Sequence, residues 1–280
     1  MSALRLAANA KVNLTLDILG RRDDGYHELR SVFARISIAD DLRVARSRRW
    51  LVAVRPSPGD GPDLGERAAR ALSSRLGREE HAAAIRVRKR IPVAAGLGGG
   101  SSDAAHVLKA LAILWRADAT AVAEVGRAIG SDVPFFLSGA ALAEVGGHGD
   151  RVRVLAGGPW HGVLVVPRAR IATAEAFALV GPADRSDGAR TATLVRRLEE
   201  GTVDAATLRS LCGNDLDRVA GSLVDEISAL RASARPAPLF LSGSGPSLFA
   251  IADDRGDALA LARRLRRGGA CAMPILIAVA

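Results

Sequence analysis

The sequence predicts an α+β fold in two domains. Three observations predict it: alternating strands open the chain, strong helical periodicity follows, and residues 239–279 run strand, turn, strand, helix, strand. That closing order is typical of helices packed on one face of a mainly antiparallel sheet. A length of 280 residues suits about two domains, and 49% apolar with 25% charged residues is ordinary for a globular chain.

Hydrophobic spacing places the elements of the first half. We expect strands at 4–6, 12–18, 29–38, 51–54, 85–88, 140–145 and 163–166, and helices at 66–76, 104–115 and 121–129. Gly130 closes the last of these helices. Pro159 separates the last two strands, so the predicted domains are 1–157 and 158–280.

The second half continues the pattern. Helices are expected at 174–179, 193–198, 216–230 and 257–265, and strands at 239–241, 248–251 and 275–279.

The charge of the chain does not by itself identify a partner. The net charge is +9, yet 36 of the 39 basic residues are Arg and Ala is abundant, which indicates a biased composition. The charge is spread along the chain, so nucleic acid is not expected as the main partner, and an anionic small substrate suits it equally well. The three lysines, Lys11, Lys89 and Lys109, stand out against this background.

Compartment signals are few. No stretch approaches the roughly 18 apolar residues of a membrane span, and the N-terminus lacks a secretory pattern. Cys212 and Cys271 lie far apart and fit neither a disulfide framework nor a metal site. We expect a cytoplasmic protein with no membrane partner.

The densest pattern is a glycine-rich loop between a strand and a helix. It consists of Pro92, Val93, Ala94, Ala95, Gly96, Leu97, Gly98, Gly99, Gly100, Ser101 and Ser102. Glycines let backbone N–H groups approach an anion, and a helix start attracts phosphate. The two serines are expected to cap the helix. A P-loop would need a following Lys, and a dinucleotide loop would need Gly where Ser101 stands.

This loop resembles the phosphate loop of the GHMP kinases. The form from Gly98 to Ala105 resembles the branch of that family that acts on a cytidyl diphosphate sugar alcohol. The resemblance runs from about Leu6 to Ile251. It implies an N-terminal ribosomal-protein-S5-like α/β domain, a C-terminal ferredoxin-like α+β domain, and ATP with Mg²⁺.

Lys11 and Asn13 are two apart on a strand and therefore share a face. A solvated edge strand is the alternative, although Asn disfavours strands. The family carries Ala-Lys-x-Asn here. The resemblance implies that Lys11 lies beside the reacting hydroxyl and that Asn13 contacts the substrate.

Tyr26, the only tyrosine, precedes His27 in an Asp-Gly-Tyr-His loop. An aromatic ring beside an imidazole can stack on a base and hydrogen-bond to it, but Tyr26 could equally cover the sheet edge. The resemblance implies that Tyr26 stacks on cytosine, that His27 bonds its polar edge, and that Phe177 closes the other face with Thr173 nearby.

Asp132 precedes Val-Pro after a helix. Such an Asp commonly caps the next helix. The family's Gly-Ala-Asp-Val-Pro matches with Ser131 for Ala, and the resemblance implies that Asp132 is the catalytic acid/base, kept ionised by Lys11.

A third glycine pattern, with Gly243, Ser244 and Gly245, joins two strands. A hairpin turn explains it, and the resemblance implies a loop beside phosphates and substrate. Asp63 stands where the family often has an adenine-contacting Asn, which puts adenine contacts from that segment in doubt. His148 has no assigned role. No metal carboxylates are visible, so Mg²⁺ is expected from ATP chemistry.

The resemblance implies an ATP-dependent kinase that phosphorylates the 2-hydroxyl of its cytidyl substrate. Another GHMP kinase, for homoserine or mevalonate, is the alternative enzyme, although neither substrate has a base to stack. A catalytically silent GHMP-like binding protein, associated with RNA through its arginines, is the alternative of another class. The oligomeric state, monomer or homodimer, is left open.

Overall fold

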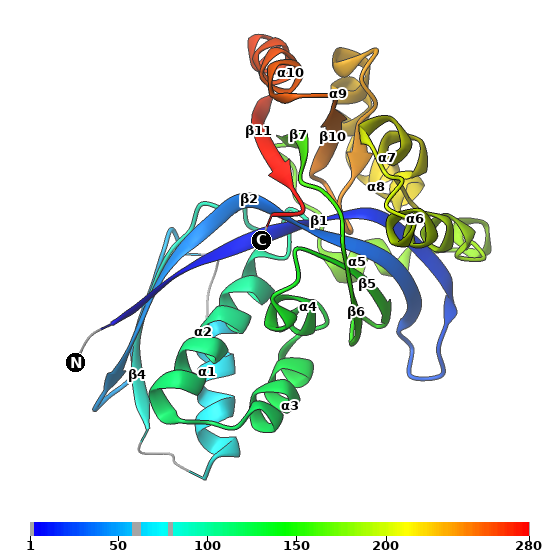
Figure 1. Ribbon diagram of the computed structural model, residues 1–280. Helices are drawn as coiled ribbons and strands as arrows, with labels where there is room; N and C mark the ends of the chain where they lie inside the picture. Colours follow the sequence, from blue (N-terminus) through cyan, green and yellow to red (C-terminus); the bar gives the residue numbers. More distant parts are fainter. Residues whose placement is uncertain (1–2, 58–62, 78–80, 280) are drawn as a thin grey trace. The chain divides into compact units, whose positions relative to one another are not determined.

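The computed structural model describes residues 3–57, 63–77 and 81–279. It forms two compact units, built from strands and helices drawn in Figure 1. The first unit is Met1–Ala10, Ile38–Val93 and Gly98–Gly139; the second is Lys11–Ser37, Ala94–Leu97 and Ala140–Ala280. These units do not coincide with the predicted domains 1–157 and 158–280, because β1 (Leu4–Arg21) and β2 (His27–Ser47) each supply residues to both. The domain boundary stays a prediction.

The first unit pairs three strands and packs helices against them. Strand β4 (Ala82–Arg88) lies between β3 (Leu51–Arg55), to which it is parallel, and the second half of β2, to which it is antiparallel. The helices are α1 (Leu64–Arg75), α2 (Gly99–Trp115), α3 (Ala119–Ile129) and α4 (Val133–Ser138). Alternate strand residues and one face of each long helix form the core. Its members include Leu42, Val44, Leu72, Ile85, Leu108, Leu111 and Trp115.

The second unit contains the predicted closing sheet. Strand β7 (Trp160–Val166) pairs antiparallel with both β10 (Leu248–Ala252) and β11 (Cys271–Ile277), and β10 pairs with β9 (Phe240–Leu241). Helix α10 (Arg255–Arg267) joins β10 to β11. Buried residues of these strands pack against α8 (Asp217–Leu223), α9 (Glu226–Ala234) and α10 in one hydrophobic cluster. The mixed α+β class with an antiparallel closing sheet is therefore confirmed.

The remaining elements of the second unit are short. Strand β5 (Leu142–Gly147) pairs with β2 and with β6 (Arg151–Leu155), and β8 (Gly213–Asn214) pairs parallel with β1. The helices are α5 (Thr173–Ala178), a 3₁₀ turn (Pro182–Asp184), α6 (Ala189–Glu199), α7 (Ala205–Leu211), α8 (Asp217–Leu223) and α9 (Glu226–Ala234).

Several boundaries differ from the sequence expectation. The strands expected at 4–6 and 12–18 are one strand, β1, because Ala8 and Ala10 are small enough to be buried where no alternation is visible. The helix expected over 216–230 is two helices. Val224 is extended between them, with φ −140° and ψ 98°, and its side chain is buried in the hydrophobic cluster. The short elements α4, β6 and α7 were not predicted.

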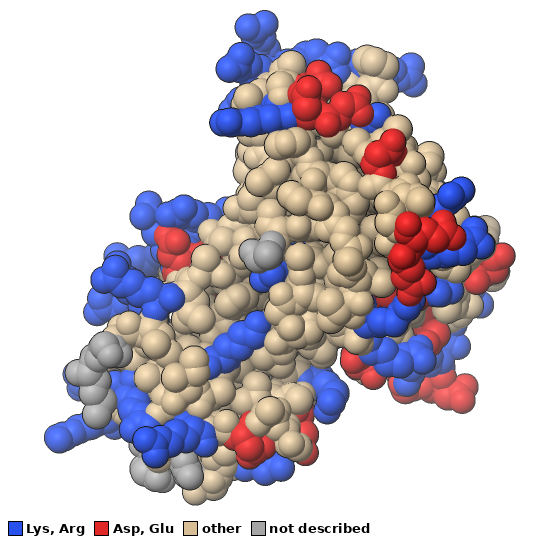
Figure 2. All heavy atoms as spheres, viewed as in Figure 1, with Lys and Arg blue, Asp and Glu red and all other residues tan. Residues whose placement is uncertain are grey.

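The charged residues are distributed rather than gathered. In Figure 2, Lys and Arg side chains occupy many separate places on the visible surface, with Asp and Glu in fewer. Among the described residues, no helix is both long enough and apolar enough to cross a membrane.

Candidate active site

In the second unit, Lys11 is a buried residue of β1. Its side chain is 4% exposed, and its Nζ donates a hydrogen bond to Asn13 Oδ1 at 2.7 Å. The ammonium also lies 4.3 Å from the centroid of the Phe33 ring, close enough for a cation–π interaction. The prediction that Lys11 and Asn13 share a face is confirmed. The alternative of a solvated edge strand is wrong, because β1 is buried on both faces at this point.

Hydrogen bonds to both the oxygen and the nitrogen of the Asn13 amide fix its orientation. Its oxygen accepts from Lys11, while its Nδ2 donates to Ser31 Oγ at 2.9 Å. Ser31 in turn donates to the carbonyl of Thr15, so the hydroxyl is available to accept from the amide. This chain of bonds fixes which way the Asn13 side chain points and holds the Lys11 ammonium in one place.

The first half of the glycine-rich loop is fastened within the second unit. Lys11 N donates to Leu97 O at 3.0 Å, and Ser247 N donates to Ala95 O at 3.3 Å. Ser242 Oγ donates to Gly96 O at 3.0 Å. The loop is therefore bonded both to the strand that carries Lys11 and to residues 241–247, the third glycine segment.

Gly96 cannot be replaced without disturbance. Its φ is +74°, and a Cβ built there would lie 2.2 Å from Ser242 O. A Cβ on Gly243 would lie 3.0 Å from Gly96 O and 3.4 Å from Asn13 Oδ1. The two glycine segments therefore contact each other next to Asn13. The segment with Gly243 also joins the paired strands β9 and β10, so the hairpin interpretation of 241–247 holds as well.

Asn214 supports the third glycine segment, and the sequence analysis missed it. Its Nδ2 donates to Leu241 O at 3.1 Å and to Gly243 O at 2.8 Å, and its Oδ1 accepts from Leu216 N. The residue is 8% exposed. A single buried Asn in a two-residue strand gives no periodic signal, so only its contacts reveal it.

Ser244 connects this segment to Thr173. The hydroxyls of the two residues lie 3.1 Å apart. Thr173 begins α5, which carries Phe177. The predicted substrate residues of 173–177 and 243–245 are thus neighbours within the second unit.

The aromatic residues form two ring pairs. The His27 and Phe177 rings lie 5.4 Å apart at 31°, and the Tyr26 and His148 rings lie 6.0 Å apart at 40°. Tyr26 is 66% exposed, so it does not cover the sheet edge as a core residue would. His148, which had no expected role, extends this aromatic group.

The surroundings of His27 favour its neutral form. Burial lowers the pKa of His27, and the nearby Arg21 and Arg185 lower it further. A neutral imidazole has one nitrogen that donates and one that accepts. Such a ring can read the polar edge of a base at neutral pH.

In the first unit, α2 begins inside the glycine-rich loop rather than at Ala104. Gly98 is the N-cap residue, with φ +67°, and no side chain caps the helix. The expectation that Ser101 and Ser102 cap it is wrong, because both lie in the first helical turn, where Ser102 Oγ donates to Asn9 O at 2.7 Å.

The start of α2 is suited to an anion. No acidic residue occupies its first turn, and the first amides have no side-chain cap. A 17-residue helix presents partial positive charge at this end. A Cβ on Gly99 would lie 3.0 Å from Ile91 Cγ2, and one on Gly100 would lie 3.1 Å from Leu64 Cδ1, so small residues are needed here.

Asp132 occupies the N-cap position of α4 but does not cap it. Its carboxylate makes no cap hydrogen bond, and its backbone is helical at φ −85° and ψ −10°. The helix-cap alternative is therefore wrong for this side chain. A Cβ on Gly130 would lie 3.7 Å from Ser101 Oγ, so the segment before Asp132 lies beside the start of α2. Lys109 Nζ donates to Phe136 O at 2.6 Å and ties α2 to α4.

A buried ion cluster behind the loop was not predicted. Lys89 Nζ donates to Asp40 Oδ2 at 2.5 Å and to Asp103 Oδ2 at 2.7 Å. Asp40 also accepts from Arg90 N and from Ile91 N, the latter at 2.8 Å. The cluster joins β2, the end of β4 and the first turns of α2. The rarity of Lys singled out Lys89. Nothing in the sequence paired it with Asp40 or Asp103, which lie 49 and 14 positions away.

The cluster shifts the ionisation of its members. Burial raises the pKa of Asp103 to about 7, although the Lys89 ammonium acts in the opposite direction. Burial acts to lower the pKa of Lys89, but the two carboxylates outweigh it and the pKa is raised.

Asp63, the departure from the family pattern, accepts a hydrogen bond from Glu66 N at 2.9 Å and caps α1.

Metal ligands remain unassigned. Within the described ranges, no group of three or more His, Cys, Asp or Glu side chains could hold a metal ion. A Mg²⁺ ion bound through phosphate oxygens and one or two protein groups needs no such cage.

Comparison with known proteins bears on this site. Residues 63–140 match the family model of the GHMP kinases N terminal domain, and residues 201–271 match that of the GHMP kinases C terminal domain. The 4-diphosphocytidyl-2-C-methyl-D-erythritol kinase of Pelotomaculum thermopropionicum is 36% identical over 271 residues, covering 93% of each chain. The enzyme of that name from Symbiobacterium thermophilum is 39% identical over 280 residues, covering 94% of this chain and 95% of its own.

Solved structures show the same fold. A crystal structure of 4-(cytidine 5'-diphospho)-2C-methyl-D-erythritol kinase superposes with a TM-score of 0.83 at 33% identity, covering 99% of this chain and all of the other. A homoserine kinase from Cytophaga hutchinsonii superposes with a TM-score of 0.73 at 14% identity, covering 99% of this chain and 95% of its own. The second likeness shows the fold alone.

Proposed function

Because this chain belongs to the GHMP kinase family, we propose that it transfers the γ-phosphoryl group of ATP to the 2-hydroxyl of 4-diphosphocytidyl-2-C-methyl-D-erythritol. The products are the 2-phosphate and ADP. Relatives of that name match the chain over nearly its full length at 32% to 39% identity. The observation that carries the substrate assignment is the aromatic group, in which a neutral His27 lies against Phe177 beside the exposed Tyr26.

The aromatic group suits a cytosine base. Tyr26 and Phe177 offer ring faces on which a flat base can stack, and His27 offers one donor and one acceptor to its edge. Homoserine and mevalonate have no base, so a kinase for either would gain nothing from this arrangement.

The start of α2 would hold the phosphates of ATP. Its uncapped amides and helix dipole attract phosphate oxygens. ATP supplies the transferred phosphoryl group, and Mg²⁺ bound with it neutralises part of the charge. Ser101 lies in the first turn of α2, where its hydroxyl can reach a phosphate or the ion.

Asp132 and Lys11 would share the chemical step. Asp132 accepts the proton of the 2-hydroxyl as its oxygen bonds to the γ-phosphorus and the bond from that phosphorus to the β–γ bridging oxygen breaks. Lys11, held by Asn13, offsets negative charge on the transferring group. Asn13 and Thr173 are proposed to contact the substrate, together with the segment Gly243 to Gly245.

The test is ADP release by the purified protein with Mg-ATP. Equal concentrations of 4-diphosphocytidyl-2-C-methyl-D-erythritol, homoserine and mevalonate are offered in parallel. The proposal expects turnover with the cytidyl substrate alone, and competition by a cytidine nucleotide. Turnover with homoserine or mevalonate instead would overturn the substrate assignment. Absence of turnover with all three, together with salt-sensitive RNA binding, would favour the silent binding protein.

A further inference from the structure

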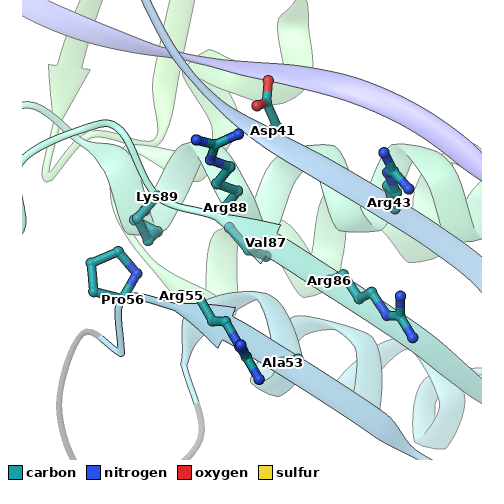
Figure 3. Close-up of a pocket in the computed structure, with 9 residues that line it drawn as sticks. All are labelled: Asp41, Arg43, Ala53, Arg55, Pro56, Arg86, Val87, Arg88 and Lys89. Carbon is teal, nitrogen blue, oxygen red and sulfur yellow. The ribbon is translucent and has the colours of Figure 1, made fainter.

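Four arginines share the outer face of the sheet in the first unit. Arg43 belongs to β2, Arg86 and Arg88 to β4, and Arg55 to β3, and all four are exposed. Figure 3 shows them projecting from the three adjacent strands. We call this set the arginine face. The alternate residues of β4, Ile85 and Val87, are buried against the helices on the other side.

The strand register sets these charges against one another. Arg43 lies directly opposite Arg86, and Arg55 lies directly opposite Arg88. Neighbouring strands are about 4.8 Å apart, so each pair holds two guanidinium groups close together. Like charges directly opposite in a sheet are destabilising. Such an arrangement is disfavoured unless an anion binds between the groups.

No described residue supplies that anion. None of the four arginines forms an ion pair within the described parts of the chain, whereas other exposed arginines, such as Arg75 and Arg153, do. Among the described residues, the acid on this face is Asp41, which lies opposite Arg88 but bonds Arg90 at 2.7 Å. The biased composition explains why arginines are numerous, but not why these four lie together with no ion pair to a described residue.

The arginine face lines a hollow of about 790 Å³. That volume is in the range of small-molecule sites. Apart from charged residues, the lining consists of Ala53, Pro56 and Val87, with no aromatic ring. Lys89 also borders the hollow, but its ammonium group is paired with Asp40 and Asp103. Among its described residues, the hollow therefore offers guanidinium groups and one carboxylate, that of Asp41, and no aromatic ring.

We propose that the arginine face binds a small anion with two or more linked phosphate groups. A guanidinium group binds phosphate through two parallel hydrogen bonds, and linked phosphates can engage adjacent arginines together. Single-stranded nucleic acid is disfavoured because its binding sites combine basic grooves with stacking aromatic rings. The four arginines lie outside the glycine-rich loop, although Lys89, which also borders the hollow, bonds Asp103 of α2. The proposal does not depend on the proposed reaction.

The probe is inorganic tripolyphosphate, measured by isothermal titration calorimetry at physiological ionic strength. The first variant is Arg43→Gln with Arg86→Gln, and the second is Arg55→Gln with Arg88→Gln. The matched control is Arg263→Gln with Arg267→Gln, which removes the same charge from exposed positions of α10. Thermal unfolding of each variant checks that it is folded.

The proposal expects two tripolyphosphate binding events in the parent protein and the control, one at the start of α2 and one at the arginine face. In both test variants one of the two should weaken at least about tenfold. Inorganic monophosphate should bind much more weakly than tripolyphosphate. The KM for ATP should be unchanged in all variants. Equal binding by every protein, or equal weakening in the control, would overturn the site. Tighter binding of a 20-nucleotide RNA or of phosphatidylserine vesicles, lost in the test variants, would overturn the small-anion assignment.

Discussion

Gly96→Ala tests whether the contact between the two glycine segments determines the conformation of the glycine-rich loop. The new Cβ would lie 2.2 Å from Ser242 O, and backbone atoms do not yield as a flexible side chain does. Reaching an acceptable separation beyond 3.0 Å requires a displacement of roughly 1 Å, which can cost about 10²-fold when it moves reacting groups. The positive φ of +74° adds about 1–2 kcal/mol of strain for a residue with a Cβ.

The assay combines kinetics with unfolding. We expect kcat/KM with ATP and the cytidyl substrate to fall about 10²-fold and the melting temperature to drop. The control is Gly77→Ala, where φ is +61° but a Cβ would meet no atom within 4 Å. Gly77→Ala should have the backbone strain of a positive φ but no steric clash, so its turnover should be unchanged. If Gly96→Ala matched it in both activity and melting temperature, the contact would not control the loop, and the reasoning would be refuted.

Four further changes address single groups. Asp132→Asn should lower kcat by about 10²–10⁴-fold in steady-state kinetics while the melting temperature stays close to that of the parent, because the carboxylate does not cap α4. Phe177→Ala should raise KM for the cytidyl substrate roughly tenfold or more with KM for ATP unchanged, because a ring face is lost. The raised pKa of Asp103, about 7 when folded, means that wild-type stability decreases as pH rises from about 4 to about 7, since the folded protein holds a proton that the unfolded chain has released. Asp103→Asn should flatten that slope in urea unfolding. Arg43→Thr should raise the free energy of unfolding by about 0.2–1 kcal/mol, because it removes one of two opposed like charges.

Each change has an outcome that contradicts it. Near-normal kcat in Asp132→Asn would remove the proton-acceptor role. An equal rise in both KM values for Phe177→Ala would indicate general disturbance rather than lost stacking. An unchanged pH slope in Asp103→Asn would place the titration elsewhere. Destabilisation by Arg43→Thr would show that the opposed arginines are not a cost to the fold.

Some of the site was predictable because its signals are local. A strand followed by clustered glycines and a helix indicates phosphate binding from backbone chemistry alone, and the structure has an uncapped helix start there. The spacing of Lys11 and Asn13 predicted a shared face, which their 2.7 Å hydrogen bond confirms. The roles of Asp132 and the aromatic residues came from resemblance, and their chemistry stays a prediction.

Other features could not be read from spacing. The Lys89 cluster joins three segments, and periodicity records which face a residue occupies but not its distant partner. Helix α2 begins at Gly99, before the expected start at 104, because tertiary contacts of the loop override the low helix propensity of glycine. The break at Val224 depends on burial of one side chain in a core formed by remote strands.

By itself, the sequence determined the α+β class, the order of the major elements and the glycine-rich loop before a helix, since each depends on residues close together in the chain. Only the tertiary structure decided where α2 begins, that Lys11 is buried, and that four arginines with no ion pair to a described residue face one hollow. Those features depend on strand register and on contacts between remote segments. Such contacts form only when the packed fold repays the entropy of bringing the segments together.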